Sequence, residues 1–374
     1  MNKSILILGG YGNFGKRIVS ELAKLPNITL YIAGPDQQKA DQVLQKKRFT
    51  SQALLKSVSL DIDSEQFERN LRLLSPNVII HTAGPFQAQS YRVARAAIGI
   101  GAHYVDLADD RAFVEGITEL DQAAKENALL VISGASSVPG LSSTVVTHYR
   151  EHFSELSHID IAIAPGNKAE RGLSTIRGIL KGTGQPFLAY ENGEWLERYG
   201  WMNVRLKNFG GDVGRRWLAN VNVPDLGLFP AHFDVKDGVR FQAGLELTLL
   251  HWVLFFMAGL AKQGWIKDVS QWTRPMAQIS RLFQTFGTDI GAMEVKIKGK
   301  NNKGNDALVR WQLTAKHGIG PYVPTIAPVL LAKKMIQQEP HLTGAMPCLG
   351  LFSLDEFTQF AESMGISIKA THIG

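Results

Sequence analysis

The chain has 374 residues, of which 45% are hydrophobic and 20% charged, a composition typical of a globular protein with a sizeable core. Its length favours two domains over one. The net charge of +6 is modest, and no basic run with interleaved aromatic side chains is present, which argues against a nucleic-acid-binding protein. The single cysteine, Cys348, excludes an internal disulfide bond and is expected to be a small buried residue.

A glycine-rich turn lies between two apolar patterns at the start of the chain. Residues 4–8 form a short apolar run typical of a buried parallel strand, and apolar residues recur at helical spacing over 14–25. Gly10, Gly12 and Gly15 therefore match the dinucleotide-binding pattern G-x-G-x-x-G in a strand-to-helix context. Gly10 allows the tight turn, Gly12 admits the pyrophosphate, and Gly15 lets the helix pack on the strand. The predicted cofactor contacts here are Gly10, Tyr11, Gly12, Asn13, Phe14 and Gly15.

Strand-like and helix-like segments alternate through the first 150 residues. The predicted strands are 4–8, 28–34, 58–62, 77–84, 103–108 and 129–134, with helical patterns such as 91–99 and 113–127 between them. This alternation predicts an α/β fold, a doubly wound parallel sheet of the Rossmann type, with ligands at the carboxyl ends of the strands.

The end of the second predicted strand bears on which dinucleotide binds. An NAD-binding fold usually has an acidic residue there that accepts the ribose hydroxyls, but this chain reads Ala33-Gly34-Pro35-Asp36. Asp36 either serves the ribose or caps the next helix, and Lys39 follows within reach of a 2′-phosphate. The missing acid and the nearby lysine favour NADP, with NAD as the alternative, and Gly34 and Lys39 as contacts.

The pattern changes after residue 151. A strand is predicted over 158–165, no repeating unit over 166–244, and a hairpin over 293–316, which suggests an α+β domain carrying an open sheet. A helix is predicted over 324–337. Ser353 is a plausible N-cap that begins a capping box with Glu356.

The longest apolar stretch is 245–261, which contains Glu246 and His251 and falls short of the roughly 20 residues needed to span a bilayer. We expect a buried helix at a domain or subunit interface, with peripheral membrane contact as a minor alternative.

Several segments together resemble the saccharopine dehydrogenase-like NAD(P)-dependent oxidoreductases. They are GGYGNFGKRIVSEL, IAGPDQQKA, HTAGPFQ, GAHYVDLADDRAFV and SGASSVPGLSS, followed later by ERGLSTIRGILKGTGQP, VRFQAGLELTLLHW and GAMPCLGLFSLDEF. The resemblance implies an NAD(P)-binding Rossmann domain over 1–150 and a substrate-binding and dimerisation α+β domain with a mixed sheet over 151–320. It also implies C-terminal helices over 321–374 that pack back on the Rossmann domain.

The resemblance also implies roles for single residues. Asp61 corresponds to an acid beside the adenine, and Asp106 lies near the nicotinamide end of the cleft. The turn 136–140, which contains Ser137, opens a helix that faces the cleft. The segment along the nicotinamide ribose is Ala83, Gly84, Pro85 and Phe86.

Two positions depart from the family pattern. Pro35 stands where family members usually carry an arginine that meets the 2′-phosphate. Val138 precedes Pro139-Gly140 where saccharopine-forming reductases carry an aspartate, which argues against saccharopine itself as the substrate.

Hydride transfer needs orientation of the cofactor and, usually, a proton donor or acceptor near the reacting carbon. The candidates are Tyr91, His103, Tyr104 and Asp106, with Asp106 preferred because of its position at the cofactor end; the alternative is a packing or capping role for each. None of the eight tyrosines begins the Tyr-x-x-x-Lys pattern of short-chain dehydrogenases.

Carboxylate-binding candidates lie in the predicted second domain. Arg171, Arg215, Arg216 and His232 are suited to hold a carboxylate or amine-bearing substrate, or else lie on the surface or in a dimer interface. No spacing of His or Cys supports a metal site, and we expect none.

Three functions remain open. The leading one is hydride transfer at a C–N bond of an amino-acid or amine conjugate, and the second is a carbonyl or enoyl reductase with a lipid-like substrate. The third is a non-catalytic dinucleotide-binding dimer. We expect a cytoplasmic homodimer with a small-molecule substrate and no transmembrane segment.

Overall fold

The computed structural model describes residues 3–87, 89–337 and 342–373, and the chain divides into two compact units. The first unit comprises Met1–Leu141 and Tyr322–Phe352, and the second comprises Ser142–Pro321 and Ser353–Gly374. The sequence-based boundary at residue 150 lies within nine residues of the first division. Residues 321–374, which were predicted to form C-terminal helices, are divided between the two units. The first part contributes one helix and one strand to the first unit, and the second part contributes one helix and one strand to the second unit.

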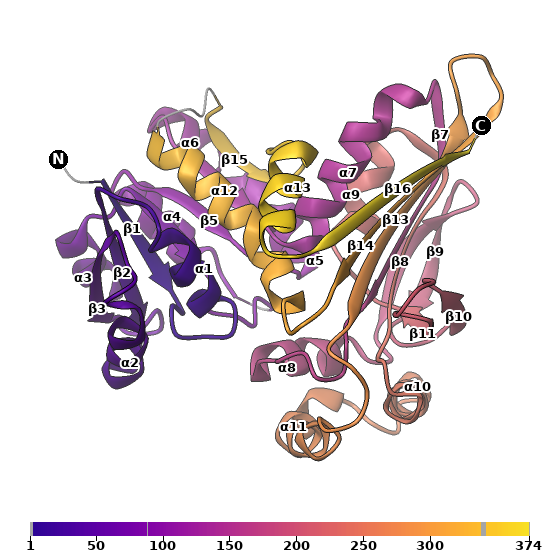
Figure 1. Cartoon of the computed structure of the whole chain (residues 1–374), viewed down its shortest axis with the longest axis horizontal. Coiled ribbons are helices and arrows are strands. Elements are labelled where there is room, and N and C mark those ends of the chain that lie inside the picture. The colour runs from indigo at the N-terminus through magenta and orange to yellow at the C-terminus, as the bar shows by residue number, and fades with distance from the viewer. Residues whose placement is uncertain (1–2, 88, 338–341, 374) are drawn as a thin grey trace. The chain divides into compact units, whose positions relative to one another are not determined.

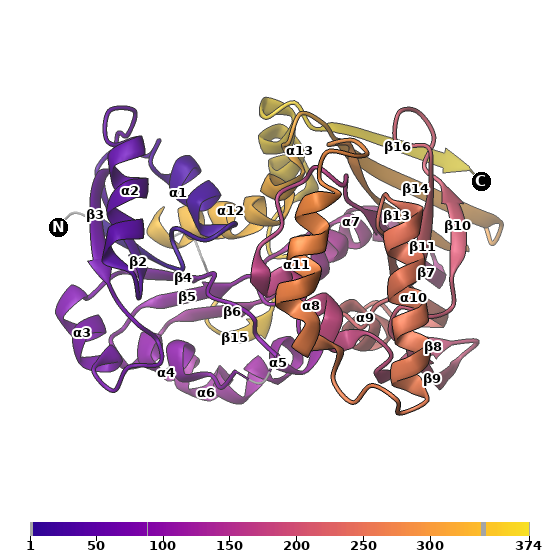
Figure 2. The ribbon, with the colours of Figure 1, turned by 90° about the horizontal axis from the view of Figure 1, so that it is seen from below.

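The first unit is a parallel sheet covered by helices on both faces, as predicted. Its seven strands follow the order β15-β6-β5-β4-β1-β2-β3, and all of the pairings are parallel. The strands are β1 (Lys3–Leu8), β2 (Ile28–Gly34), β3 (Leu54–Ser59), β4 (Val78–His81), β5 (His103–Asp106), β6 (Leu130–Ser133) and β15 (Gly344–Pro347). The helices are α1 (Gly15–Leu22), α2 (Gln37–Lys47), α3 (Phe67–Leu74), α4 (Arg92–Gly99), α5 (Arg111–Gly116), α6 (Asp121–Glu126) and α12 (Val323–Gln337). In Figure 2, α1, α2 and α12 lie on one face of the sheet and α3, α4 and α6 on the other.

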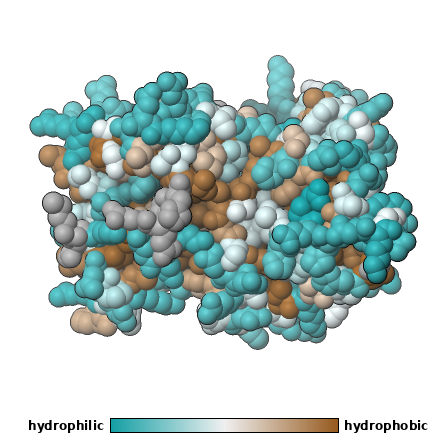
Figure 3. Space-filling model, turned by 90° about the horizontal axis from the view of Figure 1, so that it is seen from above, coloured by the Kyte–Doolittle hydropathy of each residue, from teal (hydrophilic) through white to brown (hydrophobic). Residues whose placement is uncertain are grey.

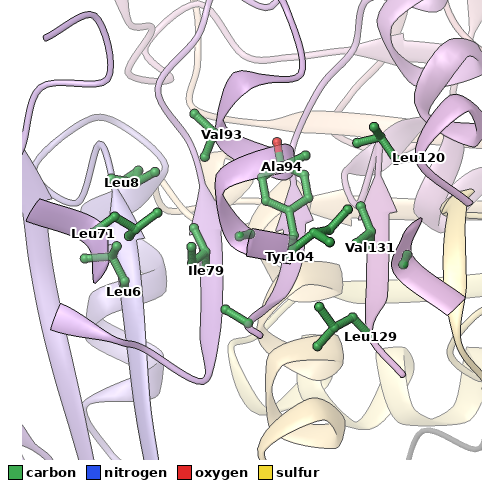
Figure 4. Packing of buried hydrophobic residues seen from close by; sticks show 14 of the residues in the cluster. Leu6, Leu8, Leu71, Ile79, Val93, Ala94, Tyr104, Leu120, Leu129 and Val131 are labelled. Carbon is green, nitrogen blue, oxygen red and sulfur yellow. The ribbon is translucent and has the colours of Figure 1, made fainter. Parts of the chain in front are cut away.

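The core of this unit forms because the strands are apolar on both sides. Leu6, Leu8, Ile79 and Tyr104 are fully buried, and they pack with apolar side chains of the covering helices (Figure 4). Ala345 belongs to the same cluster, so β15, which comes from the later part of the chain, adds to the core of this sheet.

The second unit is built on a mixed sheet, which confirms the predicted α+β domain (Figure 1). The order β10-β11-β12-β7-β13-β14-β16 is extended by β8 and β9, and the pairing of β12 with β7 is parallel while β13 pairs antiparallel with β7 and β14. The strands are β7 (Glu155–Ala164), β8 (Pro186–Glu191), β9 (Glu194–Tyr199), β10 (Arg205–Asn208), β11 (Arg215–Asn220), β12 (Val235–Ala243), β13 (Gly291–Lys300), β14 (Asp306–Ala315) and β16 (Ser367–Ile373). The helices are α7 (Ser142–Tyr149), α8 (Leu173–Gly182), α9 (Asp225–His232), α10 (Thr248–Lys262), α11 (Thr273–Leu282) and α13 (Leu354–Ser363).

Some of the elements predicted from sequence are confirmed by the structure, and others are placed differently. The hairpin is confirmed as β13–β14, and the capping box of Ser353 and Glu356 is present at the start of α13. The third strand was placed too late, because β3 is an edge strand with exposed residues such as Leu54 (55% exposed) and lacks a clear apolar pattern. The single helix predicted over 113–127 is instead α5, a 3₁₀ turn and α6.

Helix α10 is buried along one side within the chain, and its predicted burial in a subunit interface stays a prediction. Leu250, His251, Leu254 and Ala258 form one buried stripe, whereas Phe256 is 65% exposed. Among the described residues, no helix has both the length and the apolar character that a membrane span requires.

The turn between β1 and α1 depends on a close contact at Gly15. A Cβ atom at this position would lie 2.1 Å from the carbonyl oxygen of Gly9, and the neighbouring Gly10 backbone is also too near. We expect Gly15→Ala to lower the free energy of unfolding of the first unit by about 1–3 kcal/mol, because the turn must move to admit the methyl group. Chemical denaturation followed by circular dichroism measures this.

Gly99→Ala is the matched control, since a Cβ there meets only the far end of Arg72 at 3.8 Å. Its effect is expected to stay within about 0.5 kcal/mol. Equal effects of the two substitutions would contradict the packing argument.

Candidate cofactor site

The candidate cofactor residues all lie in the first unit, at the carboxyl ends of β1 to β4. Strands β1, β2 and β4 are neighbours in a parallel sheet, so their carboxyl ends share one edge. This is the edge where a doubly wound fold binds its ligand.

The glycine turn is fixed by its own backbone. The Gly9 and Gly10 amides donate to the Ala33 carbonyl at 2.9 and 3.0 Å, which ties the turn to β2, and the Gly12 amide donates to Gly9 at 2.8 Å. Helix α1 begins at Gly15, so its positive dipole end lies at the turn, where a phosphate group is stabilised.

A buried arginine holds one residue of this turn in place. Arg17 is 7% exposed, and its guanidinium donates to the side-chain oxygen of Asn13 at 2.5 Å and to the Asn13 carbonyl. The same guanidinium lies 5.3 Å from the ring centre of Tyr322. The Asn13 side chain, predicted to contact the cofactor, is therefore also part of the support of the turn.

Tyr11 covers the end of β2. A Cβ on Gly34 would lie 2.5 Å from the Tyr11 ring, and the Tyr11 hydroxyl accepts a hydrogen bond from the Asp36 amide at 3.0 Å. Glycine at position 34 is thus required by the ring, which shapes the side of the site that the adenosine half of a dinucleotide is expected to occupy.

Asp36 caps helix α2, one of the two roles that the sequence left open. Its carboxylate accepts from the Lys39 amide at 3.1 Å and pairs with the Lys39 ammonium at 3.0 Å. The hydrogen bonds from Lys39 lower the pKa of Asp36. Lys39 remains 61% exposed in its side chain, close to the end of β2. Asp61 lies just after β3 and accepts from the Asp63 amide at 3.0 Å.

The β4 end of the site is held by Thr82, which the sequence analysis did not single out. Its hydroxyl donates to Leu8 at 2.8 Å and to Gly9 at 3.2 Å, so β4 and the glycine turn are fastened together. The side chain of Gln89 donates to the carbonyls of Ala83 and Pro85 at 2.9 and 2.8 Å, which fixes the turn around Gly84.

A buried polar cluster lies behind this edge. The His81 Nδ1 atom and the Tyr104 hydroxyl are 3.0 Å apart, and His81 pairs in register with Asp106 across β4 and β5. Burial lowers the pKa of His81 to about 4, so its ring is neutral at pH 7, and burial raises the pKa of Tyr104 well above its usual value. His81 was missed from sequence, although a polar residue that ends an apolar strand was the available signal.

Asp106 is fully buried and holds the ends of two strands. Its Oδ1 atom accepts from the Gly134 amide at 2.8 Å, the Ala108 amide at 2.9 Å and the Ser133 hydroxyl at 3.0 Å. Burial raises its pKa to about 6, although these hydrogen bonds act in the opposite direction. The geometry suits a positioning residue, and a catalytic role for Asp106 or Tyr104 stays a prediction.

The remaining candidates of the first unit are anchored differently. The Tyr91 hydroxyl donates to the Phe113 carbonyl at 2.6 Å, and burial raises the pKa of Tyr91 to about 12. Phe86 is buried against the rings of His81 and Phe113, with ring centres 5.0 and 5.3 Å apart. Ser137 begins the turn after β6 and is half-buried. Cys348 is buried as expected.

Arg171 lies apart from the other candidates of the second unit. It lines an apolar pocket between α8, α10 and α11 and donates to the Gly166 carbonyl at 3.1 Å. Arg215 and His232, which do not line this pocket, are exposed on β11 and at the end of α9, while Arg216 pairs with Glu246 at 3.0 Å. Glu246 also accepts from the amides of Asn167 and Thr288, so this pair serves the structure.

A known family model matches the part of the chain that contains the glycine turn. Residues 5–132 match the model of the saccharopine dehydrogenase NADP-binding domain. The first unit therefore contains a domain similar to the saccharopine dehydrogenase NADP-binding domain. The match agrees with the predicted resemblance and with NADP as the cofactor class, and the activity of the whole chain stays a prediction.

Two further proteins are similar to this chain. A saccharopine dehydrogenase (L-Glu forming) from Saccharomyces cerevisiae shares the fold, with a TM-score of 0.71 over 100% of both chains and 12% identity. A lipid droplet localized protein from Caenorhabditis elegans is 24% identical over 165 residues, which is 42% of this chain and only 38% of that protein.

We expect Gly12→Val to weaken NADPH binding by at least about tenfold, because the branched side chain stands where the pyrophosphate must approach the backbone. A Cβ at Gly12 meets only the Gly9 carbonyl, at 3.0 Å, so the fold should tolerate the change better than a change at Gly15. Isothermal titration calorimetry with NADPH measures the affinity. An unchanged dissociation constant would contradict the assignment.

Asp106 gives a pH-dependent expectation. Its pKa of about 6 in the folded chain lies above the usual 3.8, so the folded state binds the proton more tightly. Relative to Asp106→Asn, the stability of the native chain should therefore be greatest below pH 4 and fall by about 3 kcal/mol as the pH rises to 6 and beyond. Urea denaturation of both proteins at several pH values measures this, and a difference that rises with pH would contradict it.

Proposed function

We propose that the chain reduces a carbonyl or enoyl group of a lipid-like substrate by hydride transfer from NADPH bound to the first unit. The observation that carries the substrate class is the pocket between α8, α10 and α11. Its lining is Arg171, Ile176, Ile179, Leu180, Leu245, Leu250, Leu254, Met276, Ile279 and Ser280.

The charge of this pocket favours a ligand with one anionic end. Arg171 is half-buried, and this burial lowers the pKa of its guanidinium. The negative charge of Glu246 has the opposite effect on this pKa. A guanidinium binds a carboxylate or phosphate through paired hydrogen bonds. The apolar lining suits an aliphatic group, and the enclosed volume of about 60 Å³ holds only a short part of a chain.

Hydride transfer at a C–N bond of an amino-acid or amine conjugate is the second candidate. It is supported by the family of the cofactor domain, whose name is that of saccharopine dehydrogenase. Such a substrate carries several charges, and of the predicted substrate-binding residues Arg171, Arg215 and His232 only Arg171 lines the pocket.

The rate of NADPH consumption with different substrates, measured by absorbance, distinguishes the two candidate reactions. The probes are a series of aldehydes and 2-enoic acids of increasing chain length, against 2-oxo acids supplied with an amino acid. The proposal expects kcat/KM to rise with chain length. Turnover only with the oxo acid and amine pair favours C–N chemistry, and NADPH binding without any turnover favours the non-catalytic dimer.

Arg171→Met should raise the KM for a 2-enoic acid by about tenfold or more with little change in kcat, because the lost contact is a charge-assisted hydrogen bond made in the ground state as well. Arg215→Met is the matched control, since Arg215 is exposed and lies outside the pocket. Equal effects of the two variants would contradict the role of the pocket. The homodimer and the cytoplasmic location stay predictions.

A further inference from the structure

Helices α10 and α11 expose an unusual number of large apolar side chains. These helices and the segment between them lie side by side on one face of the second unit (Figures 1 and 2). The apolar face is defined by Leu249, Phe256, Leu260, Trp265, Trp272, Ile279, Leu282 and Phe286, which are 38–80% exposed. Figure 3 shows the molecule from above, where both hydrophilic and hydrophobic residues are exposed, whereas α10 and α11 are seen in the view from below (Figure 2).

Helix α10 is apolar around its whole circumference but is buried along only one stripe. A soluble helix of this kind is normally enclosed by other elements. Next to its exposed side, Phe255, Phe256, Gly259, Leu260 and Trp265 line a shallow groove together with Gln263. An exposed apolar area of this extent marks a surface that something else covers.

The charges around the apolar face indicate what covers it. Residues 248–286 contain four cationic side chains, Lys262, Lys267, Arg274 and Arg281, and a single acidic one, Asp268. All four cationic residues are exposed. Asp268 accepts from the Ser270 amide at 2.8 Å, and this bond, with Lys181 and Arg177 near by, lowers its pKa.

A second copy of the chain is a poor partner for this face. In a two-fold symmetric dimer the same patch meets itself, so two patches that each carry four cations and one acid would be brought together. An anionic lipid surface instead attracts them, and tryptophan side chains such as Trp265 (80% exposed) favour the boundary between headgroups and hydrocarbon. Helices that lie along a surface, rather than pointing into it, suit this boundary.

We propose that the α10–α11 face docks the protein on the surface of an anionic phospholipid bilayer. The apolar side chains enter the headgroup region, and the cations contact the lipid phosphates. This docking surface is separate from the glycine turn and does not depend on the reaction that the protein catalyses.

Flotation of the full-length protein with vesicles tests the proposal. The vesicles are phosphatidylcholine alone or with one third phosphatidylglycerol. The native chain should float with the anionic vesicles at low salt and be partly released by added salt, because surface charges are screened. The combined substitution Phe256→Ser, Trp265→Ser and Leu282→Ser should lower the partition coefficient by about tenfold or more, because three inserted apolar groups are lost.

Two controls complete the experiment. Phe49→Ser with Leu73→Ser removes apolar side chains of the first unit that are 91% and 80% exposed, and it should leave vesicle binding unchanged. Light scattering of all variants reports the number of chains per particle, and NADPH affinity and circular dichroism report folding.

Three outcomes would overturn the proposal. They are no flotation of the native chain with anionic vesicles, equal loss of flotation in the control, or conversion of a dimer to a monomer by the triple substitution without a change in vesicle binding. The last outcome would assign the face to a second copy of the chain.

Discussion

The close approach of helix α1 to strand β1 is the constraint on which the cofactor site depends. At Gly15 there is no room for a Cβ, because the Gly9 carbonyl would lie 2.1 Å from it. This contact brings the start of α1 to the end of β1, and the amides of Gly9 and Gly10 then tie the same turn to β2. The Thr82 hydroxyl links the end of β4 to the end of β1. The ends of β1, β2 and β4 and the start of α1 therefore meet where a phosphate would bind.

The polar residues behind this edge maintain its shape. Asp106 joins the ends of β5 and β6 through Ser133 and Gly134, while the pair of His81 and Tyr104 links β4 to β5. Such groups are costly to bury unless they are hydrogen-bonded, so they specify one arrangement of the strand ends. These buried groups therefore hold the strand ends behind the glycine turn in place.

The sequence predicted the first unit well because its signals are local and strong. Apolar runs followed by glycines and helical spacing gave the parallel sheet, the glycine turn and five of the six strands with nearly correct bounds. The edge strand β3 was misplaced because half-exposed residues carry little apolar pattern, and β15 was missed because a four-residue strand gains its place only by pairing with β6, far away in the chain.

The second unit was harder to predict because its contacts are long-range. Strand β12 pairs with β7, which lies about 80 residues earlier in the chain, and the hydrophobic periodicity of the sequence does not predict this pairing. The substrate candidates were chosen by residue type, and type alone does not distinguish Arg171, which lines a pocket, from Arg216, whose guanidinium is taken by Glu246. Helix α10 was recognised from its apolar character, but whether that character is buried depends on the tertiary packing.

The central claim is that NADPH rests on the glycine turn of the first unit. Hydrogen–deuterium exchange of the intact chain with and without NADPH tests it most directly, because bound phosphate protects the amides that it contacts. Protection is expected over residues 9–16 and 82–86, with little change in β7 to β12. Protection confined to the second unit, or none over residues 9–16 at saturating NADPH, would contradict it.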